Sequence, residues 1–207
     1  MPGAAASAAF FGVAVLLALA PGPDNLFVLM QSALQGARGG LAVVFGLCTG
    51  LLFHTAAVAL GLAAVFAASP LAFTTLKVAG ALYLAWLAWQ AFTASSDLPG
   101  GSASSLSGWA LYRRGIVMNV TNPKVTIFFL AFLPQFIALE AGPVALQVVW
   151  FGLLFMVATF LVFGAVALCA GALGERLRRS SRLRVVLNRL AGVVFLALAA
   201  RLVAERA

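Results

Sequence analysis

Pro21-Gly22-Pro23-Asp24-Asn25 interrupts an otherwise apolar stretch that runs from Ala8 to Met30. The stretch is long enough for a membrane helix, and the interruption places prolines, a glycine and a carboxylate near its middle. A proline removes a backbone donor, and an ionisable group in hydrocarbon is costly unless it faces a partner or water. Broken helices at membrane depth are tolerated where they line a cavity. The pattern therefore predicts a transport site.

The composition is that of a membrane protein. The chain has 207 residues, of which 64% are hydrophobic and 9% are charged, and its mean hydropathy is +1.10. A helix needs about 20 apolar residues to cross the roughly 30 Å hydrocarbon core. We therefore predict an all-α integral membrane protein with six transmembrane helices, at residues 8–32, 41–68, 71–93, 115–139, 144–172 and 185–204. These segments leave no room for an extramembrane domain.

The net charge of +8 comes mainly from basic residues in the predicted loops, and it does not indicate nucleic acid binding. Basic residues gather in the first, third and fifth loops, at Arg38, at Arg113 and Arg114, and between residues 176 and 189. Cytoplasmic loops of membrane proteins carry an excess of Lys and Arg. We therefore expect these loops to be cytoplasmic and both termini to face outward, although Arg201 and Arg206 would then lie on the outer side.

A polar, glycine-rich and serine-rich stretch divides the chain into two halves. We expect a first three-helix repeat at residues 1–93, a cytoplasmic linker at 94–114 and a second three-helix repeat at 115–207, all in one membrane domain. An odd number of spans in each half would make the repeats inverted with respect to each other. In support, Pro23-Asp24 in the first half aligns with Pro123-Lys124 in the second. Helices 1 and 4 are therefore both expected to be broken at their proline motifs.

Asp24 and Lys124 are an opposite-charge pair that both reach toward the middle of the bilayer, from opposite faces. Two interpretations of the pair are open. In the first, an internal ion pair joins helix 1 to helix 4 and has only a structural role. In the second, the carboxylate attracts an ammonium group or a proton and the lysine attracts a carboxylate. The prolines beside each charge favour the second, because they expose helix ends that a clamp does not need.

Other polar residues give weaker indications. His54, the single histidine, is either a packing residue or a protonation site that couples transport to a proton gradient. Gly46 and Gly50 form a Gly-x-x-x-Gly pattern that predicts close helix packing, against a helix of the same chain or of a second subunit in a homodimer. We find no nucleophile-elbow, zinc-protease or P-loop motif. The sequence therefore predicts no enzyme activity, no cofactor and no metal site.

Five motifs extend over nearly the whole chain. They are Pro21 to Asn25, Gly46 to His54, Lys77-x-x-Gly80-Ala81-x-Tyr83-Leu84, Asn119-x-x-Asn122-Pro123-Lys124, and Phe128-Phe129 through Phe132-x-Pro134-Gln135-Phe136. Together these motifs resemble the LysE/RhtB family of amino-acid exporters. The resemblance implies a multi-pass protein of the bacterial inner membrane that exports amino acids or their derivatives, in exchange for protons.

The resemblance also implies a set of site residues. The expected substrate-binding residues are Pro21, Gly22, Pro23, Asp24, Asn25, Asn122, Pro123 and Lys124. Asp24 and His54 are candidates for proton coupling. Thr121 and Thr126 stand where apolar residues are expected in the family, which makes them candidates for specificity. A passive channel, or a membrane scaffold without transport, remains the alternative, and the sequence does not indicate which amino acid is carried.

Overall fold

The computed structural model describes residues 2–20, 22–68 and 106–179, together with isolated positions between 75 and 93 and between 185 and 200. Pro21, residues 94–105 and most of the predicted spans 71–93 and 185–204 lie outside the described residues.

The described part of the chain is helical and contains no strand. Its elements are α1 (Ala4–Leu19), α2 (Pro23–Ala68), α4 (Gly108–Val120), α5 (Pro123–Ile127), a π-helical turn η1 (Phe128–Phe132), the 3-10 turns η2 (Leu133–Phe136) and η3 (Leu139–Ala141), and α6 (Val144–Arg179). By length and composition, two helical stretches are apolar enough to cross a membrane, Val144–Ala170 and Pro23–Gly61, of which the second is divided at Gly36. The bent pair Gly108–Val120 and Pro123–Phe136 can form a further span. These findings confirm the all-α prediction for the described part of the chain, whose longest helices are apolar enough to span a membrane.

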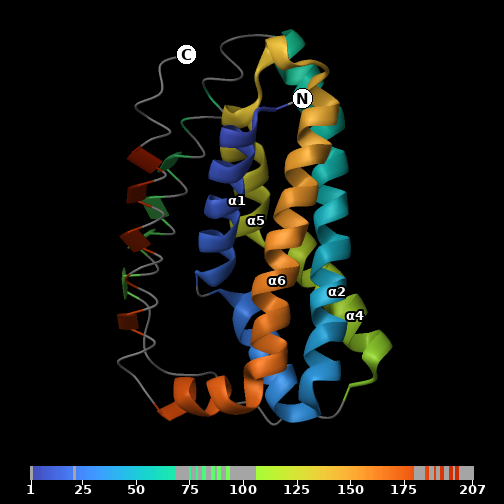
Figure 1. Cartoon of the computed structure of the whole chain (residues 1–207), viewed down its shortest axis with the longest axis vertical. Coiled ribbons are helices and arrows are strands. Elements are labelled where there is room, and N and C mark those ends of the chain that lie inside the picture. The colour runs from blue at the N-terminus through green and yellow to red at the C-terminus, as the bar shows by residue number, and fades with distance from the viewer. Residues whose placement is uncertain are drawn as a thin grey trace.

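The first predicted span is broken where the sequence indicates. Helix α1 ends at Leu19 because Ala20 is extended, with φ of −60° and ψ of 125°, and Pro23 then starts α2. Proline suits this first helical position, where its missing N–H would have no partner. Helix α2 is interrupted again at Gly36, whose φ of 74° is readily adopted only by glycine. In Figure 1 the chain descends through α1 and the first part of α2, turns, and rises through the rest of α2.

The second broken span runs in the opposite direction. Helix α4 begins at Gly108, earlier than the predicted residue 115, because the Ser107 side chain accepts a hydrogen bond from the backbone N–H of Ala110. It ends at Val120, and the chain bends by 48° before it continues from Pro123 to Phe136. In Figure 1 this segment rises from α4 through α5 while α1 descends. The observed pair of broken helices is antiparallel, whereas the full six-helix inverted repeat includes residues that are not described.

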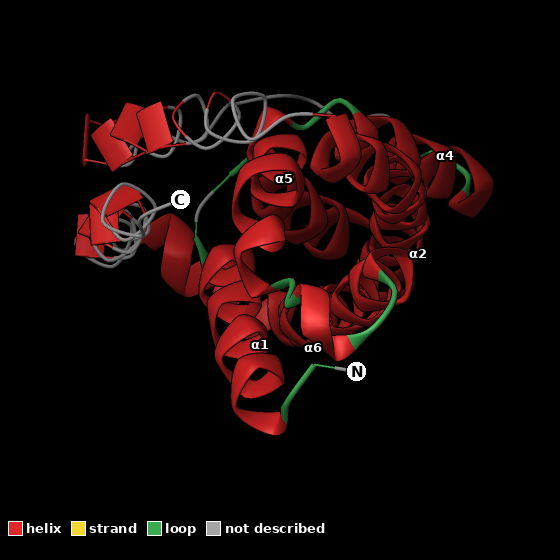
Figure 2. Ribbon diagram, turned by 90° about the horizontal axis from the view of Figure 1, so that it is seen from above, coloured by secondary structure: helices red, strands yellow, loops and turns green. Residues whose placement is uncertain are grey.

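Helix α2 packs against α4 through small residues. A Cβ atom added to Gly46 would collide with the backbone at Tyr112 and Gly115, and one added to Gly50 would lie 2.6 Å from the Cβ atom of Asn119. The partner of the Gly-x-x-x-Gly face is therefore a helix of the same chain. Figure 2 shows α4 beside α2, with α6 on another side of the bundle. This use of Gly46 and Gly50 gives no support to a dimer.

We expect Gly46→Ala to lower the free energy of unfolding by about 2 kcal/mol or more, because the opposing atoms are backbone and cannot move aside cheaply. The measurement is thermal or denaturant unfolding of the purified protein in detergent. Gly164→Ala is the matched control, because a Cβ there meets no atom within 4 Å. Equal stability of the two variants would show that the α2–α4 contact is looser than the structure indicates.

Two apolar clusters lie on either side of the breaks. The first, here called the phenylalanine cluster, lies toward the start of α1 and the end of η2. Its aromatic members are Phe10, Phe128, Phe129, Phe132, Phe136, Phe151 and Phe155. The second lies toward Gly36 and the start of α4 and includes Phe27, Val43, Leu111 and Phe163. The polar residues of the breaks are therefore enclosed between two apolar layers.

Candidate functional site

The two helix breaks meet and exchange hydrogen bonds. The Nδ2 atom of Asn122 donates to Oδ2 of Asp24 at 2.8 Å. The Nζ atom of Lys124 donates to the carbonyl oxygens of Leu17, at 3.3 Å, and Ala20, at 3.1 Å. Carbonyls at the end of a helix have no partner within it and carry partial negative charge, so a lysine is well suited to bind them. The second break thus supplies hydrogen-bond donors, and the first break supplies the carboxylate and carbonyl acceptors.

Local structure fixes the polar side chains of the site. Asn122 caps α5, because its Oδ1 atom accepts from the backbone N–H of Lys124 at 3.0 Å. Asn25 donates from Nδ2 to the carbonyl of Ala18 at 2.8 Å, which ties α2 back across the break to α1. At Gly22, an added Cβ would lie 2.9 Å from Nζ of Lys124, so the absence of a side chain lets the ammonium group approach the break. Asn25, Asn122 and Gly22 position the charged residues.

Asp24 and Lys124 are both buried, with 2% and 7% of their surfaces exposed, yet they do not form a direct ion pair. Among the described residues, no lysine or arginine nitrogen lies within 4.0 Å of the Asp24 carboxylate. The two charges attract each other across the site, while Asn122 and the carbonyls of α1 make the direct contacts. If the two charges served only to join the helices, we would expect a direct ion pair between them, and none is formed.

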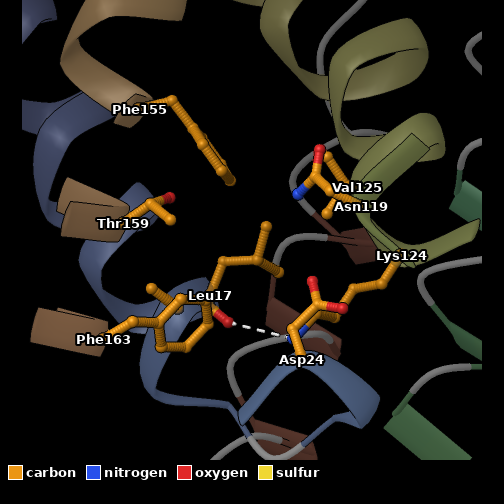
Figure 3. A pocket seen from close by; sticks show the side chains of 9 residues that line it. Leu17, Asp24, Asn119, Lys124, Val125, Phe155, Thr159 and Phe163 are labelled. Atoms are coloured by element: carbon orange, nitrogen blue, oxygen red, sulfur yellow. Dashed lines mark hydrogen bonds between the residues drawn. The ribbon is translucent and has the colours of Figure 1, made fainter. Parts of the chain in front are cut away.

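The charged residues line a small pocket. Its other walls come from α1, α4, α5 and α6, and its full lining is Leu17, Ala18, Asp24, Asn119, Lys124, Val125, Phe155, Thr159 and Phe163. In Figure 3 the Leu17 side chain points into the space between the α6 residues and the polar residues Asp24, Asn119 and Lys124, and the dashed line joins its carbonyl to Lys124. The cavity volume is about 10 Å³, roughly enough for one water molecule. Since ligand pockets usually measure roughly 300–1,000 Å³, side chains must move before a solute can enter.

Several hydrogen-bonding atoms of the pocket residues have no partner. Oδ1 of Asp24 and Oδ1 of Asn119 are buried acceptors without a hydrogen bond in the described structure. Lys124 has three N–H donors and uses two of them. Buried polar groups are almost always paired, so unpaired acceptors and a spare donor around one cavity make it a candidate binding site. Their chemistry matches a zwitterion, with an ammonium group for the acceptors and a carboxylate for the lysine.

His54 lies behind the pocket rather than in its wall. It is buried, its Nε2 atom is 3.1 Å from the carbonyl oxygen of Asn119, and its ring packs near Phe129. Asn119 therefore joins His54, through its backbone, to the pocket, through its side chain. This connection gives the histidine a contact with the site that its position in the sequence does not reveal.

The other predicted site residues are placed as follows. Pro23 and Pro123 each begin the helix after a break, and Pro21 is outside the described residues. Thr121 is exposed and donates to the carbonyl of Val117, and Thr126 donates to the carbonyl of Asn122. Neither threonine lines the pocket.

The sequence reasoning missed the wall of the pocket that α6 supplies. Phe155, Thr159 and Phe163 are spaced by four residues, which places them on one helix face. The sequence pattern that could have indicated this wall is a single threonine between two phenylalanines in an unbroken apolar helix.

Comparisons with known proteins give a family model and several relatives that match the chain. Residues 15–206 match the family model described as LysE type translocator. The chain is 33% identical, over 199 residues, to a homoserine/homoserine lactone efflux protein of Salmonella typhimurium, and the alignment covers 96% of each chain. A protein of the same name from Salmonella typhi is also 33% identical over 199 residues, with 96% of each chain covered. An uncharacterized membrane protein of Vibrio cholerae is 38% identical over 130 residues, which are 62% of this chain and 63% of that one.

No solved structure matches the chain. The family model nevertheless spans both helix breaks and nearly the whole sequence, and the efflux proteins align over almost their full length. The chain therefore belongs to the LysE type translocator family and is a membrane transport protein rather than an enzyme.

Proposed function

We propose that this protein exports amino acids or their derivatives across the bacterial inner membrane by secondary active transport. The observation that carries the proposal is the meeting of two broken helices around a pocket in which Asp24 and Lys124 are buried but not directly paired. The efflux proteins of Salmonella, to which the chain is similar along its length, make homoserine and homoserine lactone the first substrates to test.

The pocket atoms suggest how a zwitterion binds. The substrate ammonium group donates to Oδ1 of Asp24 and Oδ1 of Asn119, which are the unpaired buried acceptors of the residues that line the pocket. Its carboxylate accepts the spare N–H of Lys124, while the other two N–H groups keep the lysine on the carbonyls of α1. Charge-assisted hydrogen bonds of this kind are stronger than neutral ones, and a site within the bilayer excludes the water that would weaken them.

Transport requires that the site open to each side in turn. The cavity of about 10 Å³ is lined in part by Leu17 and lies between the two apolar clusters, so it is too small to admit an amino acid as it stands. We propose that the two halves rock against each other about the helix breaks, as in transporters built from inverted repeats. The phenylalanine cluster would then separate on one side of the site and the cluster of Phe27 and Phe163 on the other.

We further propose that export is coupled to proton entry. Asp24 is the proposed proton acceptor, because a carboxylate that binds an ammonium group can release it when it is protonated. His54 is the second candidate, since it reaches the pocket through the carbonyl of Asn119. In this scheme the proton and the substrate ammonium group compete for the same oxygen.

Inverted membrane vesicles test the proposal, because an exporter pumps substrate into them. We expect saturable uptake of labelled homoserine that rises when the vesicle interior is acidic and falls when a protonophore collapses the gradient. Vesicles without the protein are the control. Flux that does not saturate and ignores the gradient would indicate a channel, and an absence of flux with every amino acid tested would indicate a scaffold.

A further inference from the structure

Thr159 differs from five other threonines of the described chain in how its hydroxyl is used. Five threonines donate to the carbonyl four residues earlier, at Thr49, Thr55, Thr93, Thr121 and Thr126. Such bonds satisfy a hydroxyl within its own helix. Thr159 is buried, with 3% of its surface exposed, and makes no hydrogen bond in the described part of the chain. Its hydroxyl is available to a ligand.

Thr159 lies in the wall of the pocket that faces the charged residues. It lies on α6, across the pocket from Asp24, Asn119 and Lys124, and Figure 3 shows the Leu17 side chain between the two walls. A substrate whose ammonium and carboxylate groups are held by the charged wall extends its side chain toward α6. The side chain then meets a hydroxyl between two phenyl rings, those of Phe155 and Phe163.

We propose that the Thr159 hydroxyl forms a hydrogen bond with the substrate side chain. This contact would favour substrates with short, neutral side chains that end in a hydrogen-bonding group. This inference rests on the proposed function. The hydroxyl can donate to or accept from a substrate hydroxyl or carbonyl. The pocket lining described contains no carboxylate on the α6 wall, so a side chain bearing an ammonium or guanidinium group would be left without a partner. Apolar side chains lose the hydrogen bond and gain only contact with the rings.

The test compares two substrates that differ by one hydroxyl group, homoserine and 2-aminobutyrate, in competition for transport. Thr159→Val keeps the shape of the side chain and removes the hydroxyl. We expect the variant to lower the preference for homoserine over 2-aminobutyrate by roughly twofold to tenfold, which is the range of one net hydrogen bond. The change should come from slower homoserine transport, while 2-aminobutyrate transport is kept or increased.

Two further variants separate recognition from folding. Thr159→Ser restores a hydroxyl and should restore much of the preference. Thr55→Val is the matched control, because Thr55 is equally buried but its hydroxyl is already bound to the carbonyl of Leu51 at 2.8 Å. This control should leave the preference unchanged.

The outcomes distinguish the two proposals. If the wild-type protein transports both amino acids and Thr159→Val leaves their ratio unchanged, the role of Thr159 is overturned and the proposed function stands. If the wild-type protein transports neither these nor any other amino acid, both proposals are overturned.

Discussion

Asp24→Asn is expected to lower homoserine export by roughly 10-fold to 100-fold, which corresponds to the loss of one hydrogen bond to a charged group. Asparagine keeps the shape of the side chain and can still accept the hydrogen bond that Asn122 donates at 2.8 Å. It lacks the negative charge that an ammonium group needs, so the variant should fail to bind substrate. It should remain folded, because Lys124 keeps its hydrogen bonds to the carbonyl oxygens of Leu17 and Ala20. Initial rates in inverted vesicles, normalised to the amount of protein, measure the effect.

Glu140→Gln provides the control for Asp24→Asn. It removes the same charge from an exposed carboxylate in η3, outside the pocket. We expect wild-type transport from this variant. If Asp24→Asn transported homoserine as well as this control does, Asp24 would not be a substrate-binding residue.

Lys124→Met is expected to abolish homoserine export and also to lower the free energy of unfolding by about 3–5 kcal/mol, the range for losing one partner of a buried charge pair. The substitution leaves the carbonyls of Leu17 and Ala20 without their donor and leaves Asp24 without a compensating charge. Unfolding in detergent measures the stability, and vesicle uptake measures the transport. Arg113→Met, at an exposed position of α4, is the control for the loss of a positive charge.

A double variant separates a binding role of the charges from a clamping role. Asp24→Asn combined with Lys124→Met removes both buried charges, so it should recover part of the stability that Lys124→Met loses. We expect no recovery of transport. A double variant that is stable and transports homoserine like the wild type would show that the charges serve only to join the helices.

The helix breaks could be predicted from the sequence because proline acts locally. Pro23 and Pro123 cannot continue a preceding helix, and a helix can restart at either of them. The structure accordingly ends α1 at Leu19 and starts α5 at Pro123. The start of α4 was predicted seven residues late, since hydropathy marks apolar sequence and not the cap at Ser107 that begins the helix at Gly108.

The wall of the site on α6 could not be predicted from the sequence. It depends on which face of an unbroken apolar helix points toward the breaks, and that face is set by packing with α1 and α2. The bridge through Asn122 and the spare hydroxyl of Thr159 depend on side-chain directions in the same way. The sequence indicated the two charges, whereas their separation by Asn122 and by the carbonyls of α1 required the structure.

Binding of homoserine and homoserine lactone to the purified variants tests the central proposal most directly. Both molecules carry an ammonium group at a pH where the lactone amine is protonated, but the lactone has no carboxylate. We predict that Asp24→Asn weakens the binding of both ligands, whereas Lys124→Met weakens the binding of homoserine much more than that of the lactone. Equal losses for the two ligands in Lys124→Met, or unchanged binding in Asp24→Asn, would contradict a site that divides the zwitterion between the two helix breaks.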